Sequence, residues 1–227
     1  ADKKKAEEAA AKEAAEAAAK DGKKKKSTGG NKKIDPDPLG DALLKTETPL
    51  KDAADMLEPL LRHAGEFEDT HLLAFDVYRR KGKLLLALRA AAAAVRASPK
   101  SFAARKNIAH IAALVASLPA DTAPAVKTVL EEGVGKLTGG KTAVAYAEAL
   151  VSEATSVRGV PSAAALAAEA IGLVSGAAKG AAAAAAAAQS AALEGASVKQ
   201  CKTALAVLTR VEKTAAETLK ARCAAVH

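Results

Sequence analysis

The sequence predicts an all-α protein, and its composition gives the first reason. Half of the 227 residues are hydrophobic, but 62 are alanine and only 2% are aromatic. Alanine and leucine favour helices, whereas strands are enriched in β-branched and aromatic side chains. The second reason is that apolar residues recur at helical spacing between Gly and Pro breaks. The apolar stretches are too short or too alanine-rich to cross a bilayer, so we expect no membrane association.

The first 33 residues are predicted to form a separate domain, a basic helix followed by a linker. Residues 2–20 are almost entirely Ala, Glu and Lys, which are strong helix formers. Because this helix has no hydrophobic stripe, it cannot dock on a core and is expected to protrude. Asp21 and Gly22 end it, and the following basic, Gly-containing residues form a flexible connection. The second predicted domain covers residues 34–227.

The second domain is predicted to be a series of helices. Pro49 marks the start of the first one, since proline is favoured at the first helical position. Gly82 lies between the second and third helices, and Pro99 stops the third. Alanine fits every face of a helix, so the ends of the later helices are set mainly by Gly, Ser and Pro. The predicted helices cover residues 49–61, 69–80, 83–97, 102–117, 123–136, 143–156, 163–174, 180–193 and 198–226.

Residues 68–101 also fit part of the 34-residue tetratricopeptide (TPR) template. Tyr78, Ala87, Ala94 and Pro99 occupy the Tyr, the two Ala and the Pro positions of that template. The Trp, Leu and Gly positions hold other residues. Such a unit is a helix hairpin that needs stacked neighbours on both sides to bury its faces. We therefore expect a TPR-like α-solenoid of helix pairs.

Positive charge is predicted to concentrate at the N-terminus. The chain carries a net charge of +8, and residues 1–33, with 11 Lys and six acidic residues, account for +5. This segment has no aromatic residue for base stacking, which favours contact with a phosphate backbone, most simply RNA, without sequence readout. Two alternatives are a solvated surface helix and a histone H1-like nucleic-acid-binding protein. The candidate RNA-binding residues are Lys3, Lys4, Lys5, Lys23, Lys24, Lys25, Lys26, Lys32 and Lys33.

One stretch matches the phosphate-binding loop pattern G-x-x-x-x-G-K-[ST]. Its defining residues are Gly135, Gly140, Lys141 and Thr142. A phosphate-binding loop needs a strand before it, whereas residues 125–132 are predicted to be helical. We therefore favour a glycine-rich loop between helices, and nucleotide hydrolysis through Lys141 and Thr142 stays as an enzymatic alternative.

Other catalytic, metal and cofactor patterns are not found in the sequence. An acetyl-CoA loop would need Arg or Gln at position 130, which is Leu130. The four histidines have no metal-ligand spacing, and His71 is predicted to be packed or half-buried. Cys201 and Cys223 are predicted to be small hydrophobes in a reducing cytosolic or nuclear setting. We expect no catalytic residue, no cofactor, no metal and no small-molecule substrate of the chain's own.

Several short runs resemble a known family in order and spacing. They are the TETPL run at residues 46–50, the EPL run at 58–60, the THLLAFDVYRRK run at 70–81 and the LLL run at 84–86. Together they resemble the C-terminal region of the large auxiliary subunit of the N-terminal acetyltransferase A (NatA) complex. The lysine-rich segment upstream and the last helices around Cys201 and Cys223 are also similar to that subunit.

The resemblance implies a non-catalytic scaffold. In that family, a TPR-like solenoid wraps a separate catalytic subunit, which binds acetyl-CoA and the peptide. The family's internal basic helix contacts ribosomal RNA (rRNA) near the tunnel exit, and by position it corresponds to the nine candidate lysines. The resemblance therefore implies a cytoplasmic protein that anchors the NatA catalytic subunit to the ribosome for co-translational N-terminal acetylation.

Overall fold

The computed structural model describes residue 40, residues 45–191 and residues 193–226. The described residues from Glu47 onward form one compact unit. Their secondary structure is helical throughout, with turns between the helices. The helices are α3 (Pro49–His63), α4 (Glu68–Arg80), α5 (Leu84–Ala97), α6 (Phe102–Ala116), α7 (Pro124–Thr138), α8 (Ala143–Ser156), α9 (Pro161–Ser175), α10 (Ala177–Ser190), α11 (Val198–Val211) and α12 (Lys213–Val226).

Proline and short hydroxyl side chains set most of the helix starts. Proline is the first residue of α3, α7 and α9, where its missing N–H would have no partner within the helix. Ser101, Thr142 and Ser197 precede α6, α8 and α11, and each side chain accepts a hydrogen bond from a backbone N–H of the first turn. Gln200 completes a capping box with Ser197. The sequence therefore defines these boundaries locally.

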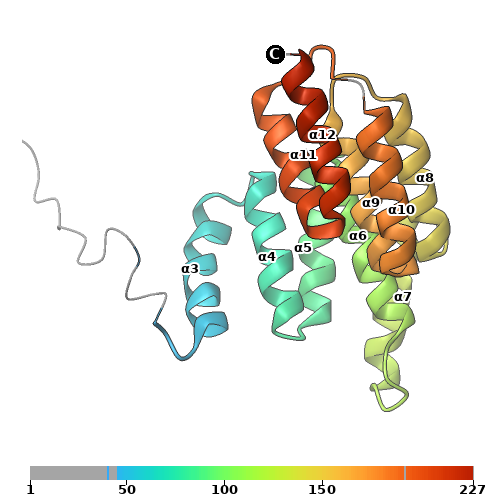
Figure 1. The fold of residues 1–227 in the computed structure, drawn as a ribbon. Helices are drawn as coiled ribbons and strands as arrows, with labels where there is room; N and C mark the ends of the chain where they lie inside the picture. Colours follow the sequence, from blue (N-terminus) through green and yellow to red (C-terminus); the bar gives the residue numbers. More distant parts are fainter. Residues whose placement is uncertain (1–39, 41–44, 192, 227) are drawn as a thin grey trace, which may run out of the picture. The chain divides into compact units, whose positions relative to one another are not determined.

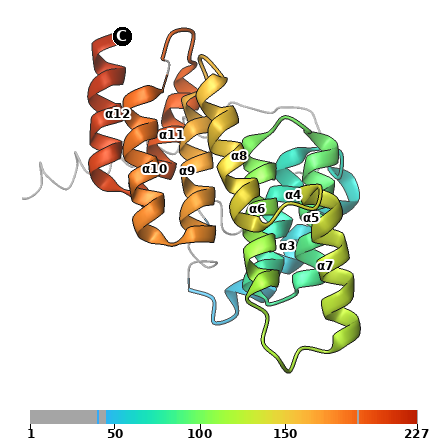
Figure 2. The same cartoon turned by 90° about the vertical axis from the view of Figure 1, so that its right-hand side faces the viewer.

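Most helices pack against the helices that precede and follow them in the chain, and α7 packs on α5 and α6. Figure 1 shows α4 and α5 side by side, and Figure 2 shows α9 beside both α8 and α10. Helix α9 also contacts α6 and α11, so it connects the middle of the unit with its C-terminal helices. This serial packing is typical of a solenoid, in which each helix pair contacts its neighbours.

The core is divided into three successive clusters. One joins α3 to α7 around Phe75, the second lies between α6, α8 and α9, and the third lies among α9 to α12. Alanine makes up most of the second and third clusters, so their helices are in close contact. The first cluster contains the larger side chains, among them Phe75, Ile111 and Leu130.

The predicted all-α class is confirmed for the described residues, and the helix pairs are consistent with a TPR-like solenoid. Helices α4 and α5 form the hairpin that the template predicted. The predicted protruding helix at residues 2–20 and the predicted boundary between residues 33 and 34 lie outside the described residues and stay predictions. Within the described ranges, no helix is both long and apolar enough to span a membrane.

The prediction of a single helix over residues 198–226 is wrong. Helix α11 ends at Val211 and α12 begins at Lys213, with Glu212 in an extended conformation between them. No Gly or Pro marks this break in the sequence. It allows the chain to reverse, so that α12 packs against both α11 and α10. A continuous helix would have extended beyond the alanine core that the two shorter helices share.

Candidate functional site

The nine predicted RNA-binding lysines lie outside the described residues. Their role therefore stays a prediction. Among the described residues, no group of three or more His, Cys, Asp or Glu side chains is arranged to hold a metal ion.

The structure contradicts the phosphate-binding-loop alternative. Gly135 lies inside α7, and the pattern follows a helix rather than a strand. Gly139 and Gly140 adopt the left-handed conformation, with φ of 64° and 78°, so they end the helix. Thr142 caps α8 by accepting a hydrogen bond from the Ala145 N–H, at 3.2 Å between Thr142 Oγ1 and the Ala145 nitrogen. These residues thus connect two helices and do not form a phosphate cradle.

His71 and the two cysteines lie in packed positions, as predicted. His71 is half-buried, and its Nε2 lies 2.7 Å from the Gly65 carbonyl oxygen. Cys201 is buried and Cys223 half-buried, on α11 and α12. Burial and the neighbouring Cys201 thiol raise the pKa of Cys223, so this thiol has none of the activation of a catalytic cysteine.

His110 is a partly buried titratable group that the sequence did not single out. Its ring lies 5.9 Å from the ring of Phe75, centroid to centroid, between α4 and α6. Burial, with a further contribution from Arg79 and Lys106, lowers its pKa from 6.5 to about 4. In the folded chain the His110 ring is therefore uncharged at neutral pH, and it acts as a packing residue.

Acidification is expected to destabilise the fold through His110. Because its pKa is lower in the folded chain, the unfolded chain takes up the proton first, and stability falls as the pH drops from 6.5 towards 4. The shift would correspond to about 3 kcal/mol for a fully shielded ring, but screening at this partly exposed ring reduces the expected loss to about 1–2 kcal/mol. Urea unfolding at pH 7 and at pH 5 measures this loss in the free energy of unfolding. His110→Gln should show a smaller loss than the wild type, and the exposed-site control His63→Gln should keep the wild-type loss. An equal loss in all three proteins would contradict the assignment.

Sequence analysis missed a long cationic stretch in the second domain. Between Asp76 and Asp121 the chain has no acidic residue, although it has nine cationic ones. The signal was present in the sequence, but the small net charge of the whole domain concealed it. The nine are Arg79, Arg80, Lys81, Lys83, Arg89, Arg96, Lys100, Arg105 and Lys106.

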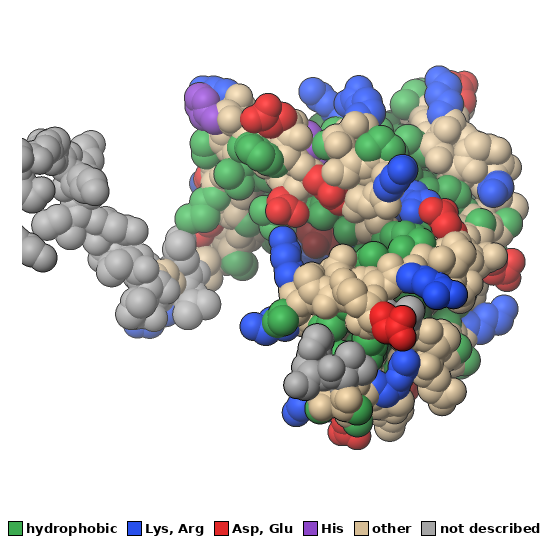
Figure 3. All heavy atoms as spheres, turned by 90° about the horizontal axis from the view of Figure 1, so that it is seen from above, with side chains coloured by type: hydrophobic (Ala, Val, Ile, Leu, Met, Phe, Trp, Pro, Cys, Tyr) green, Lys and Arg blue, Asp and Glu red, His purple; other side chains and the backbone are tan. Residues whose placement is uncertain are grey.

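Three of these nine cations are neutralised by acidic residues. Arg79 pairs with Asp76 at 3.6 Å, Arg105 with Glu153 at 2.6 Å and Lys106 with Glu169 at 3.3 Å. The Arg105 guanidinium also lies over the Phe102 ring, 4.4 Å from its centroid. The other six cations form no ion pair within the part of the chain that the structure describes, and they lie at the end of α4, on α5 and in the turns that flank α5. On the face shown in Figure 3, positive and negative side chains are interspersed with hydrophobic ones.

A groove between α3, α4 and α5 contains two of the unpaired cations. We call it the arginine groove. It has a volume of about 270 Å³, and its lining includes Leu61, His71, Tyr78, Leu86, Arg89 and Arg96. Arg89 and Arg96 are both exposed, and no residue that lines the groove is acidic. The groove therefore combines apolar side chains with two positively charged ones.

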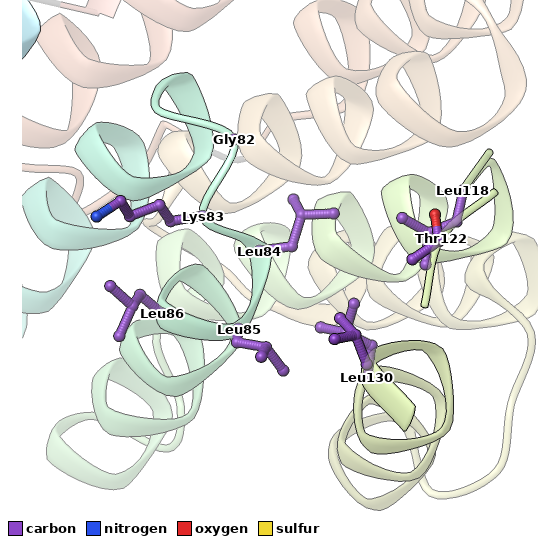
Figure 4. Close-up of a pocket in the computed structure, with 9 residues that line it drawn as sticks. Gly82, Lys83, Leu84, Leu85, Leu86, Leu118, Thr122 and Leu130 are labelled. Carbon is purple, nitrogen blue, oxygen red and sulfur yellow. The ribbon is translucent and has the colours of Figure 1, made fainter. Parts of the chain in front are cut away.

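A second groove, between α5 and α7, is almost entirely apolar. It has a volume of about 460 Å³. Figure 4 shows Leu85 of α5 pointing towards Leu130 of α7 and Leu84 pointing into the gap, with Leu118 and Thr122 on its far side. The Lys83 side chain points away from this gap. With no acid or base directed into it, this groove has no groups for acid–base chemistry.

Comparison with known proteins gives matches in the N-terminal part of the chain. Residues 1–94 match the family described as "N-terminal acetyltransferase A, auxiliary subunit". Over 96 residues, 42% of the chain, it is 33% identical to the N-terminal acetyltransferase A complex auxiliary subunit NAA15 of Arabidopsis thaliana. Over 49 residues, 22% of the chain, it is 49% identical to the mouse and 47% identical to the human N-alpha-acetyltransferase 16, NatA auxiliary subunit.

The matched stretches cover 11% of the Arabidopsis relative and 6% of the mouse and human relatives. The family match at residues 1–94 includes the basic N-terminal segment, α3, α4 and most of α5, but not Arg96 of the arginine groove. The resemblance to the auxiliary subunit of N-terminal acetyltransferase A is therefore confirmed, and it rests on the first 94 residues of the chain.

Proposed function

We propose that this chain is part of a non-catalytic auxiliary subunit of a NatA complex that anchors the catalytic subunit to the ribosome near the tunnel exit. The lysines at positions 3–5, 23–26, 32 and 33 contact rRNA, and the helical unit serves as a scaffold in the cytoplasm. The family match over residues 1–94 is the observation that carries this function, because it includes both the lysines and the first described helices.

The architecture of the described residues supports a scaffold. Each helix packs mainly on helices one to three places away in the chain, and the core is distributed over three clusters. Such a solenoid presents an extended surface to partner chains. The relatives are named as auxiliary subunits of an acetyltransferase complex, which supports a partner that performs the catalysis.

The lysine segment suits a ribosomal RNA surface for electrostatic reasons. Residues 1–33 carry a net charge of +5 and have no aromatic residue. Lysine binds phosphates as a point charge and does not need a particular base sequence. If about six lysines contact phosphates, the slope of log affinity against log salt concentration should be about −4 to −5.

Charge reversal of Lys23 to Lys26 tests the proposed function. The variant with Glu at all four positions should lose ribosome binding in co-sedimentation at physiological salt, because four attractive contacts become repulsive. Its helical circular dichroism signal should match that of the wild type. The matched control reverses four exposed lysines of the described unit, Lys136, Lys141, Lys199 and Lys202, and should still co-sediment. Unchanged co-sedimentation of the Lys23–Lys26 variant would reject the docking role of these lysines.

The H1-like alternative makes a different prediction for the same segment. It requires tight binding of duplex DNA by residues 1–33, without an acetyltransferase partner. Competition between ribosomes and a duplex DNA fragment for the full chain distinguishes the two. A clear preference for duplex DNA would favour the alternative.

A further inference from the structure

The arginine groove is built from residues outside the segment of predicted RNA-binding lysines. It lies on the described unit, where α3, α4 and α5 are neighbours (Figure 1). Leu61 comes from α3, His71 and Tyr78 come from α4, and Leu86, Arg89 and Arg96 come from α5. Three helices that are consecutive in the chain therefore build it.

The polar groups of the groove are mainly hydrogen-bond donors. Each arginine offers a planar guanidinium that can bind a carboxylate through two parallel hydrogen bonds. Neither guanidinium forms an ion pair or hydrogen bond with another described residue. Helix α5 has no acidic residue, and the His71 Nε2 already contacts the Gly65 carbonyl oxygen. The groove thus lacks a negative partner of its own.

The spacing of the two arginines defines the size of the ligand. Arg89 and Arg96 are seven residues apart on α5, so they lie on one side of the helix about 10 Å apart along its axis. Ala93 lies between them, and its small side chain leaves room above the helix. Two carboxylates about two helical turns apart on a partner segment can contact both guanidinium groups.

We propose that the arginine groove binds an acidic, amphipathic segment of a partner polypeptide. Two of its carboxylates pair with Arg89 and Arg96, and its aliphatic side chains pack on Leu61 and Leu86. The leucines of the lining favour a polypeptide over a nucleic acid, because a phosphate backbone has no aliphatic side chain to bury there. This contact is independent of ribosome docking by the N-terminal lysines.

A synthetic peptide of matching chemistry tests the groove with the full chain. The probe is a fluorescein-labelled, helix-forming 16-residue peptide with Glu at positions 4 and 11 and Leu at positions 7 and 8. Fluorescence anisotropy should show saturable binding that weakens with salt. A second peptide with Gln in place of both Glu should bind about tenfold or more weakly, because both charge-assisted contacts are lost.

Charge reversal on the protein should have a matching effect. Arg89→Glu with Arg96→Glu should weaken binding of the Glu peptide about tenfold to a hundredfold. The control variant, Lys136→Glu with Lys141→Glu, makes the same change in net charge on exposed residues at the end of α7 and in the following loop. It should leave binding of the Glu peptide nearly unchanged. A peptide with Lys at positions 4 and 11 should bind the arginine variant better than it binds the wild type. Circular dichroism confirms that both variants are folded.

Four outcomes would overturn the proposed groove ligand. The first is no saturable binding of the Glu peptide, and the second is an equal loss in the two charge-reversed variants. The third is failure of the Lys peptide to rescue binding to the arginine variant. The fourth is that a single-stranded RNA oligonucleotide binds the wild type more tightly than the peptide does and binds the arginine variant only weakly. This outcome would make the groove an RNA-binding surface. The Lys23–Lys26 variant should bind the Glu peptide normally, so failure here is distinguishable from failure of ribosome docking.

Discussion

Replacing Phe75 by alanine is expected to lower the free energy of unfolding by about 3–5 kcal/mol, because it leaves a cavity in the core cluster that contains the larger side chains. Phe75 has no solvent exposure and belongs to the cluster that joins α3 to α7. Its helix contacts α3, α5 and α6, so a cavity there weakens three packing surfaces at once. Many neighbouring core residues are alanines, which cannot extend into the space. Urea denaturation followed by circular dichroism measures the loss.

Phe67 provides a matched control for this substitution. It lies just before α4 with 59% of its surface exposed, so Phe67→Ala removes the same atoms from a position where little area is buried. The expected cost is below about 1 kcal/mol. If Phe75→Ala and Phe67→Ala unfold at the same urea concentration, Phe75 does not form the centre of that cluster.

A single methyl group at Gly180 is expected to destabilise the C-terminal helices by about 1–3 kcal/mol. A Cβ at Gly180 would lie 2.6 Å from the Gly172 Cα and 3.2 Å from the Gly172 nitrogen. Because both atoms are backbone, α9 and α10 would have to move apart to relieve the overlap. This cost exceeds the gain of up to about 1 kcal/mol that alanine normally gives over glycine inside a helix. The midpoint of thermal unfolding should fall in Gly180→Ala.

The control for Gly180 is another helical glycine. Gly135 lies in α7, and a Cβ there would have no neighbour within 4 Å. Gly135→Ala should therefore be neutral or stabilising, by up to about 1 kcal/mol. Opposite signs for the two substitutions are the expected result. A stabilised Gly180→Ala variant would show that α9 and α10 do not approach as closely as the structure describes.

Much of the fold could be predicted because the boundaries between helices are local. Pro49, Pro124 and Pro161 start helices, and Ser101 and Thr142 cap them. These signals act within one turn, so the sequence contains all the information needed to place them. The helix break at Glu212 is different, because its cause is not local. That break depends on how α11 and α12 pack on distant helices, and no residue near it signals a turn.

Packing partners were harder to predict than helix positions. Alanine is compatible with any face, so the alanine-rich helices α9 and α10 do not show in the sequence which residues are buried. The contact between Gly172 and Gly180 is visible only once the two helices are placed together. The same holds for the lowered pKa of His110, which results from burial against neighbouring helices.

For the candidate sites too, part was visible in the sequence and part depended on the packing of distant helices. The basic N-terminal segment is evident from composition, because 11 lysines fall within 33 residues. The arginine groove could be predicted only in part. The absence of acidic residues between Asp76 and Asp121 is visible in the sequence, but which cations are neutralised is not. Glu153 and Glu169 come from α8 and α9, far along the chain, and they neutralise Arg105 and Lys106 while leaving Arg89 and Arg96 unpaired.

We propose above all that this chain serves as a scaffold between an acetyltransferase and the ribosome. Affinity purification of the tagged chain from its own cells, followed by mass spectrometry, tests that claim most directly. The expected result is co-purification of a NatA catalytic subunit together with ribosomal proteins, with the ribosomal proteins lost in the Lys23–Lys26 charge-reversed variant and the catalytic subunit retained. Recovery of chromatin proteins without an acetyltransferase or ribosomes would contradict it.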